Sequence, residues 1–108
     1  MSFAVFLTDD AAADLEELYD YLDTHTVDDR ADYVHGEIKR VFQSLDSEPD
    51  RGSFPKELLA LGIRDFREIY FKPYRIIYRV IEDRVYVLVI ADGRRDMQAL
   101  LQRRLLQS

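Results

Sequence analysis

The chain has 108 residues and fits one domain, since a protein of this size buries roughly 60 to 70 per cent of its unfolded surface around a single core. It contains no cysteine, which excludes disulfide bridges and thiolate metal sites. No stretch approaches the roughly 20 apolar residues that cross a bilayer, and residues 1–8 lack the basic start of a secretory signal. We therefore expect a cytoplasmic protein without a membrane partner.

The net charge of −6 is unevenly distributed along the chain. Residues 1–50 hold 14 acids and 3 bases, a net charge of −11, whereas residues 51–108 hold 7 acids and 12 bases, a net charge of +5. Proteins that bind nucleic acid usually carry a basic balance overall, because phosphate neutralisation supplies most of their affinity. Only the second half therefore offers a basic surface, and the acidic half is equally typical of a solvated helix pair.

The N-terminal half predicts one strand followed by two helices. Residues 3–8 are rich in Phe and Val, and Thr8 with two following aspartates supplies helix-starting chemistry. Apolar residues then recur at three- and four-residue spacing, so that each helix has one apolar face, and acids such as Asp14 point largely away from it. These apolar residues are Ala11, Leu15, Leu18, Tyr19 and Leu22, and then Ala31, Val34, Ile38, Val41, Phe42 and Leu45. A break at 24–28 makes the two helices a hairpin that ends before Pro49.

The C-terminal half predicts an antiparallel meander and a final helix. Three segments, 66–71, 74–81 and 84–91, are dense in Ile, Val, Phe and Tyr and are separated by turns. In the middle strand, alternation of side chains places Arg75, Ile77 and Arg79 on one face and Ile76, Tyr78 and Val80 on the other. Residues 50–62 form a turn-rich connection with a compact apolar link, and residues 94–107 are typical of an amphipathic helix.

The predicted fold is a single α+β domain over residues 1–108, with the order β-α-α-β-β-β-α. The helical hairpin is expected to pack on a small, twisted, mainly antiparallel sheet, with the last helix at the C-terminus.

Three segments of this layout resemble the RelE/ParE toxin superfamily of type II toxin–antitoxin systems. They are Phe-Arg-Glu-Ile at 66–69, Tyr-Arg-Ile-Ile-Tyr-Arg-Val at 74–80 and Ile-Ala-Asp-Gly-Arg-Arg-Asp at 90–96. The Leu-Thr start before an acidic helix is similar to ParE-type members. The resemblance implies a growth-inhibiting toxin, of the kind that stabilises plasmids, whose partner is a cognate antitoxin protein.

The superfamily implies two mechanisms, between which fold alone does not choose. ParE-type members inhibit DNA gyrase, whereas RelE-type members enter the ribosomal A site and cut mRNA. A toxin fold that has become an inactive binding module is the third reading. The segment at 90–96 and the Leu-Thr start favour the ParE-like branch and an inhibitor that is not an enzyme.

The chemistry of RNA cleavage also favours the inhibitor. Cleavage without a metal requires activation of the 2′-hydroxyl, stabilisation of the phosphate charge and protonation of the leaving oxygen. Laid along the RelE pattern, the chain keeps cations at Arg67, Arg75 and Arg95, the residues that would act if the protein were a ribonuclease. It has Ile69 in place of a second strand lysine and Leu101 in place of the C-terminal tyrosine.

Other proton donors and metal ligands are poorly supported by the sequence. Tyr70, Tyr78 and Tyr86 are more typical of sheet aromatics than of catalytic groups. His25 and His35 lie in the predicted hairpin, away from the basic strands. Because no cluster has metal-ligand spacing and no glycine-rich phosphate loop is present, we expect no cofactor.

The resemblance suggests two contact surfaces. Gyrase contacts are expected at four arginines of the C-terminal segment, Arg94, Arg95, Arg103 and Arg104. Antitoxin contacts are expected at the basic strand face and the apolar hairpin face, at Arg67, Arg75, Arg79, Leu15, Leu18 and Leu22. If the apolar stripes of the hairpin and the final helix are exposed, the free chain should self-associate.

Overall fold

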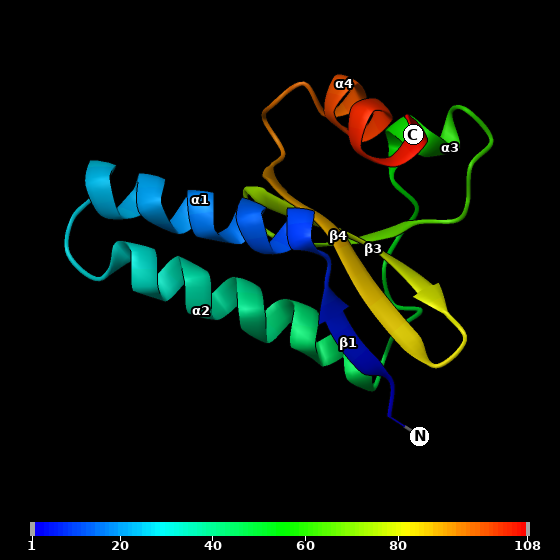
Figure 1. Cartoon of the computed structure of the whole chain (residues 1–108), viewed down its shortest axis with the longest axis horizontal. Helices are drawn as coiled ribbons and strands as arrows, with labels where there is room; N and C mark the ends of the chain where they lie inside the picture. The colour runs from blue at the N-terminus through cyan, green and yellow to red at the C-terminus, as the bar shows by residue number, and fades with distance from the viewer. Residues whose placement is uncertain (1, 108) are drawn as a thin grey trace.

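The computed structural model describes residues 2–107 and shows helices packed around one twisted sheet (Figure 1). The elements are β1 (Ala4–Leu7), α1 (Asp9–His25), α2 (Arg30–Gln43), a 3-10 turn η1 (Ser44–Asp46), α3 (Lys56–Leu59), β2 (Arg67–Phe71), β3 (Tyr74–Ile81), β4 (Arg84–Asp92), α4 (Met97–Leu101) and a π-helical turn η2 (Gln102–Leu106). The predicted α+β fold and the order of its main elements are confirmed.

The sheet has the strand order β1-β4-β3-β2. Strands β2, β3 and β4 form the predicted antiparallel meander, in which Tyr70 pairs with Arg75 and Ile76 pairs with Ile90. Strand β1 lies parallel to β4, with Val5 opposite Val85. Parallel pairing is possible because a long connection, which comprises the hairpin, α3, β2 and β3, separates the two strands in sequence.

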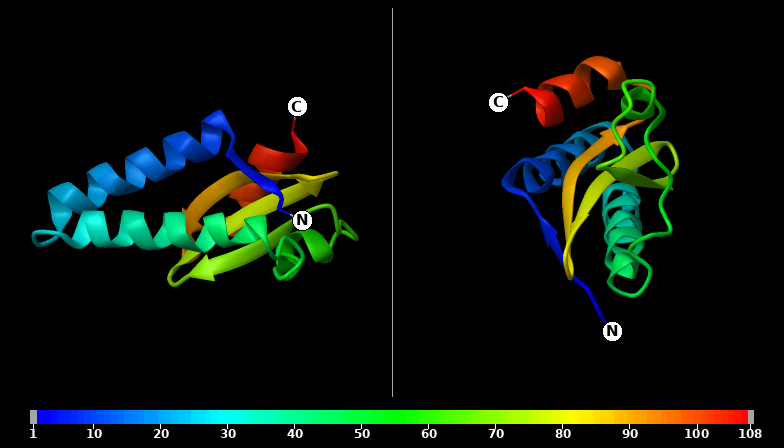
Figure 2. Two further views of the ribbon diagram at one scale, coloured as in Figure 1. Left: turned by 90° about the horizontal axis from the view of Figure 1, so that it is seen from below. Right: turned by 90° about the vertical axis from the view of Figure 1, so that its right-hand side faces the viewer.

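Both faces of the sheet are covered by helices. Neighbouring residues of β3 point to opposite faces, and Ile76 and Tyr78 pack with the hairpin while Ile77 packs with α3 and α4. Figure 2 shows the twist of the sheet and the separate positions of the hairpin and the C-terminal helix. The apolar stripes are therefore buried in the free chain, and the premise for expecting self-association is wrong.

A register shift in β4 distributes its apolar residues between the two cores. The shift falls between Ile77 and Tyr78 of β3, which pair with Val89 and Val87 of β4, so that Leu88 is the extra residue of a bulge. Val85 and Val87 consequently pack with the hairpin, whereas Val89 packs with α4. Simple alternation along the sequence predicts one face for all three valines and misses this change.

The helix starts follow local chemistry. Thr8 is the N-cap of α1, since its hydroxyl accepts a hydrogen bond from the backbone N–H of Ala11 at 3.2 Å, and Asp9 and Asp10 occupy the first turn. The C-terminal helix begins later than predicted. Asp96 is its N-cap and accepts from the N–H of Ala99 at 3.1 Å, so that residues 94 and 95 belong to the preceding turn.

The sequence did not predict helix α3. It follows Pro55, whose carbonyl accepts hydrogen bonds from the N–H groups of Leu58 and Leu59, and its buried Leu58 joins the core beneath α4. One turn is too short to show apolar periodicity, which explains why residues 56–59 were predicted as an irregular link. None of the helices among residues 2–107 is long and apolar enough to span a membrane.

Tyr78 connects the sheet to the loop that precedes α3. Its side chain is fully buried, and its hydroxyl donates to the carbonyl of Pro49 at 2.7 Å and accepts from the N–H of Gly52 at 3.0 Å. A Cβ atom at Gly52 would lie 2.5 Å from this hydroxyl, so only glycine fits there.

We expect Tyr78→Phe to lower the free energy of unfolding by about 1–3 kcal/mol, because it leaves a buried N–H and a buried carbonyl without their partner. Chemical denaturation monitored by circular dichroism measures the change. Tyr33→Phe is the matched control, since Tyr33 is exposed. Equal stability of both variants and the unaltered chain would contradict the assigned role.

Candidate functional site

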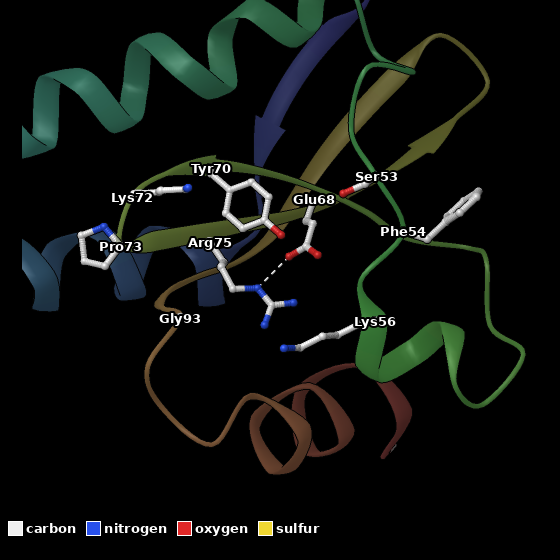
Figure 3. Close-up of a pocket in the computed structure, with 9 residues that line it drawn as sticks. All are labelled: Ser53, Phe54, Lys56, Glu68, Tyr70, Lys72, Pro73, Arg75 and Gly93. Carbon is white, nitrogen blue, oxygen red and sulfur yellow. Dashed lines mark hydrogen bonds and ion pairs between the residues drawn. The ribbon is translucent and has the colours of Figure 1, made fainter.

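The candidate site is a pocket of about 400 Å³ on the α3/α4 side of the sheet. We call it the Arg75 pocket (Figure 3). It is formed by β2, β3, the start of α3 and the loops around them, and its lining residues are Ser53, Phe54, Lys56, Glu68, Tyr70, Lys72, Pro73, Arg75 and Gly93.

Arg75 is buried and bound by two carboxylates. Its Nε donates to Glu68 Oε1 at 2.6 Å, and its two terminal nitrogens donate to the two oxygens of Glu57 at 2.9 and 2.8 Å. The side chains of Arg75, Glu57 and Glu68 are 8, 12 and 4 per cent exposed. All three guanidinium nitrogens are therefore engaged, and the positive charge is internally neutralised.

The pattern of the strands explains why these groups meet. Arg75 sits on the central strand β3, and alternation puts its side chain on the same face as Ile77, toward α3 and α4. On β2 the residues of that face are Glu68 and Tyr70. Glu57 comes from α3, so the two-carboxylate arrangement fixes this short helix to the sheet.

The electrostatics keep the ion pairs charged. Hydrogen bonds from Arg75 lower the pKa of Glu57 and outweigh its burial, which acts in the opposite direction. The hydrogen bonds that Arg75 donates to Glu57 also raise the pKa of Arg75. Burial, and secondarily the neighbouring Glu68 carboxylate, raise the pKa of Tyr70.

The three arginines expected for RNA cleavage do not converge. Arg67 begins β2 on the same face as Ile69, which packs with the hairpin, whereas Arg75 points to the opposite face. Arg95 lies in a different hollow beside Asp14 and α1. The expectation that Arg67, Arg75 and Arg95 surround one phosphate is corrected by this placement.

The two apolar residues that replace the lysine and the tyrosine of the RelE pattern lie in the hydrophobic cores on the two faces of the sheet. Ile69 is 4 per cent exposed against the hairpin, and Leu101, the last residue of α4, is fully buried in the core between α4 and the sheet. Of the three candidate tyrosines, Tyr78 is a core residue, Tyr86 stacks on Phe6, and Tyr70 alone lines the Arg75 pocket.

The two histidines stay on the hairpin. His25 Nδ1 lies 2.9 Å from the carbonyl of Tyr21, and His35 packs edge-on against Tyr19. Within residues 2–107, no group of three or more metal-binding side chains comes together.

The four C-terminal arginines differ in how free they are. Arg94 pairs with Asp92 at 2.6 Å, whereas Arg95 and Arg103 are exposed. Arg104 is only 17 per cent exposed and forms two hydrogen bonds of 3.0 Å with Asp14. It acts in this structure as an internal tie between the C-terminal turn and α1.

Asp14, predicted to lie off the apolar face of its helix, is bound by other parts of the chain. Its Oδ2 also accepts from the N–H of Ile90 at 3.0 Å, while Arg104 donates to the carbonyl of Leu88 at 2.8 Å. The pair thereby satisfies two backbone groups at the β4 bulge, which β1 is too short to cover.

The apolar residues predicted to contact an antitoxin are part of the hairpin core. Leu15 and Leu22 are buried and offer little surface in the free chain, whereas Leu18 is partly buried and lines a hollow with Tyr21 and Arg95. Arg75, expected in the same surface, is buried as well. Arg67 and Arg79 keep contact with solvent.

Sequence reasoning missed Glu57 and Glu68. A signal for Glu68 was present, since it is an acid in an otherwise apolar strand, on the face that carries Arg75. A buried arginine on a central strand requires such a partner. Glu57 had no comparable signal, because the helix that carries it was itself not predicted.

The comparisons with known proteins agree with this architecture. A family model described as the ParE toxin of the type II toxin–antitoxin system parDE matches residues 5–97. A search of curated proteins gave no match.

Three solved structures are similar in fold. The chromosomal ParDE system from P. aeruginosa is 19 per cent identical with a TM-score of 0.70, covering 84 per cent of this chain and 96 per cent of that chain. The toxin–antitoxin complex RelBE2 from Mycobacterium tuberculosis is 19 per cent identical with a TM-score of 0.61, covering 85 and 99 per cent. A free double-arginine mutant of the E. coli toxin RelE is 16 per cent identical with a TM-score of 0.64, covering 97 and 100 per cent.

We expect Glu57→Gln to lower the free energy of unfolding by about 3 kcal/mol, because it leaves a buried guanidinium with one carboxylate in place of two. Glu37→Gln is the control, since Glu37 pairs with the exposed Arg40 and should change stability by less than about 1 kcal/mol. Urea denaturation at neutral pH compares the two, and an equal effect would contradict the role of Glu57.

The pH dependence has a defined sign. Because the pKa of Glu57 is lowered in the folded state, its stabilising contribution is fully present above the ordinary glutamate pKa and is lost as the pH falls through the folded value. Acid titration of unfolding should therefore show a shallower loss of stability in Glu57→Gln than in the unaltered chain. Parallel titration curves would contradict this assignment.

Proposed function

Because the chain belongs to the ParE toxin family of type II toxin–antitoxin systems, we propose that it inhibits DNA gyrase and is neutralised by a cognate antitoxin. The main observation in favour of gyrase inhibition over RNA cleavage is the ion pairing of Arg75. Its charge is occupied by Glu57 and Glu68, and the pocket therefore lacks a free central cation for a phosphate.

The rest of the pocket supports the same conclusion. RNA cleavage needs a base for the 2′-hydroxyl, cations for the phosphate and an acid for the leaving oxygen. Ile69 and Leu101 are apolar core residues outside the pocket lining, and they can neither hold a phosphate nor transfer a proton. The carboxylates of Glu57 and Glu68 add negative charge beside the position that a phosphate would take.

The proposed gyrase surface is the loop before α4 together with the C-terminal turn. Arg94, Arg95 and Arg103 are exposed there, and the guanidinium of Arg94 forms an ion pair with Asp92. Arg104 is better assigned to holding the C-terminal turn in place, because its guanidinium is bound by Asp14 and Leu88. Exposed arginines are frequent in the energetically important parts of protein interfaces.

A second candidate function is a ribosome-dependent endoribonuclease. Its specific support is that Lys56, Lys72 and Tyr70 line the same pocket as Arg75. Primer extension on transcripts from cells that express the chain tests it. New cuts at A-site codons would favour this function over gyrase inhibition.

We expect the purified chain to inhibit gyrase supercoiling and to accumulate cleaved gyrase–DNA complexes. The double variant Arg95→Ala/Arg103→Ala should weaken inhibition on the order of tenfold, since it removes two exposed cations of the proposed interface. Lys39→Ala is the control, because Lys39 is also exposed but belongs to α2 of the hairpin, outside the proposed surface. Unchanged supercoiling at saturating protein concentration would refute the proposed target.

A further inference from the structure

A second basic cluster lies where β2 begins and β3 ends. It surrounds a hollow of about 390 Å³ that we call the arginine hollow. Its lining residues are Asp50, Arg64, Asp65, Arg67, Arg79 and Val80. None of these residues lines the Arg75 pocket.

Arg67 is held in place without being neutralised. One terminal nitrogen donates to the carbonyl of Gly52 at 2.8 Å and to that of Asp50 at 3.3 Å, and the guanidinium lies 4.7 Å from the centre of the Phe54 ring. No carboxylate among residues 2–107 forms an ion pair with it. Its remaining donors are therefore fixed in orientation and available to a ligand.

Arg79 is a second guanidinium with spare donors. It lies 3.7 Å from Asp65, and both side chains are about half exposed, at 44 and 56 per cent. An ion pair this long and this exposed is weak. The group also lies 5.8 Å from the centre of the Phe66 ring, and the exposed Arg64 lines the same hollow.

Two neighbouring guanidinium groups suit an oxyanion with two or more acceptor oxygens, that is, a carboxylate or a phosphate. Two features favour a single carboxylate over a nucleic-acid backbone. Asp50 and Asp65 line the same hollow, and the chain carries a net charge of −6, so a continuous run of phosphates would be repelled. Phe54 and Phe66 offer ring faces to apolar neighbours of the bound acid.

We propose that the arginine hollow binds an acidic side chain from an extended segment of the cognate antitoxin, with Arg67 and Arg79 as the two principal contacts. This inference rests on the proposed antitoxin partner and is independent of whether gyrase is the target. It replaces the broader surface expected from the sequence, of which Arg75, Leu15 and Leu22 are buried.

The test is a titration of the full chain with the antitoxin encoded beside it, by calorimetry at low and at high salt. We expect Arg67→Gln/Arg79→Gln to weaken binding on the order of tenfold or more at low salt, with a smaller difference at high salt. Arg30→Gln/Lys39→Gln removes the same number of exposed positive charges from α2, where neither residue lines the arginine hollow, and should leave affinity within about threefold.

Thermal melts of each variant separate binding from folding. Arg79→Gln alone tests the proposal if Arg67→Gln unfolds, because Arg79 is exposed and forms no hydrogen bond with the backbone among residues 2–107.

Equal weakening of antitoxin binding by the control pair, or no weakening of binding by Arg79→Gln in a folded protein, would overturn the proposal. Binding of a single-stranded oligonucleotide that is lost in the double variant would also overturn it, in favour of a phosphate ligand. A negative gyrase assay leaves this measurement unaffected.

Discussion

The structure depends on how a buried guanidinium at the centre of the sheet is compensated. Arg75 lies on β3 with strands on both sides, where an unpaired charge would be strongly destabilising. Glu68 compensates it from the adjacent strand and Glu57 from α3. Because Glu57 reaches Arg75 only when α3 is packed on the sheet, the position of the whole segment between the hairpin and β2 follows from this pairing. The same pairing neutralises the guanidinium at the centre of the pocket, so that the other cations of its lining are Lys56 and Lys72.

A second polar contact has the corresponding role on the other side of β4. The bulge at Leu88 directs Val87 and Val89 to different cores, but it also leaves backbone groups that β1 does not reach. Asp14 and Arg104 bind these groups and each other. The N-terminal helix, the bulge and the C-terminal turn are thus connected by one partly buried ion pair. Asp14 comes from the negatively charged half of the sequence and Arg104 from the positively charged half. Part of the charge asymmetry of the chain is therefore neutralised within the folded structure.

The sequence was sufficient for the elements whose signals are local and repeated. The apolar spacing of the hairpin, the Thr8 cap and the three dense strands each predicted the observed structure. The sequence also predicted correctly which face of the sheet carries the Arg75 side chain, but it did not predict that this side chain is buried. Alternation along a strand shows which way a side chain points and does not show whether a helix covers that face. The bulge, the one-turn α3 and the late start of α4 at Asp96 depend on tertiary pairing or on a single cap, and no periodic pattern records them. For the same reason the sequence identified Arg75 as a site residue but did not identify its two carboxylate partners, Glu57 and Glu68.

These constraints divide the arginines of the chain into two kinds. Arg75 and Arg104 are bound by carboxylates on residues distant in sequence, and they hold helices against the sheet. Arg67, Arg79, Arg95 and Arg103 retain donors at the surface, the first two at one end of the sheet and the last two near the C-terminal segment. A family resemblance assigns roles to arginines by position in the sequence and does not distinguish the two kinds. The two kinds of arginine are distinguished by whether a carboxylate already neutralises the guanidinium. By this criterion we place the proposed partner contacts at the Arg67/Arg79 pair and the Arg95/Arg103 pair, and not in the Arg75 pocket.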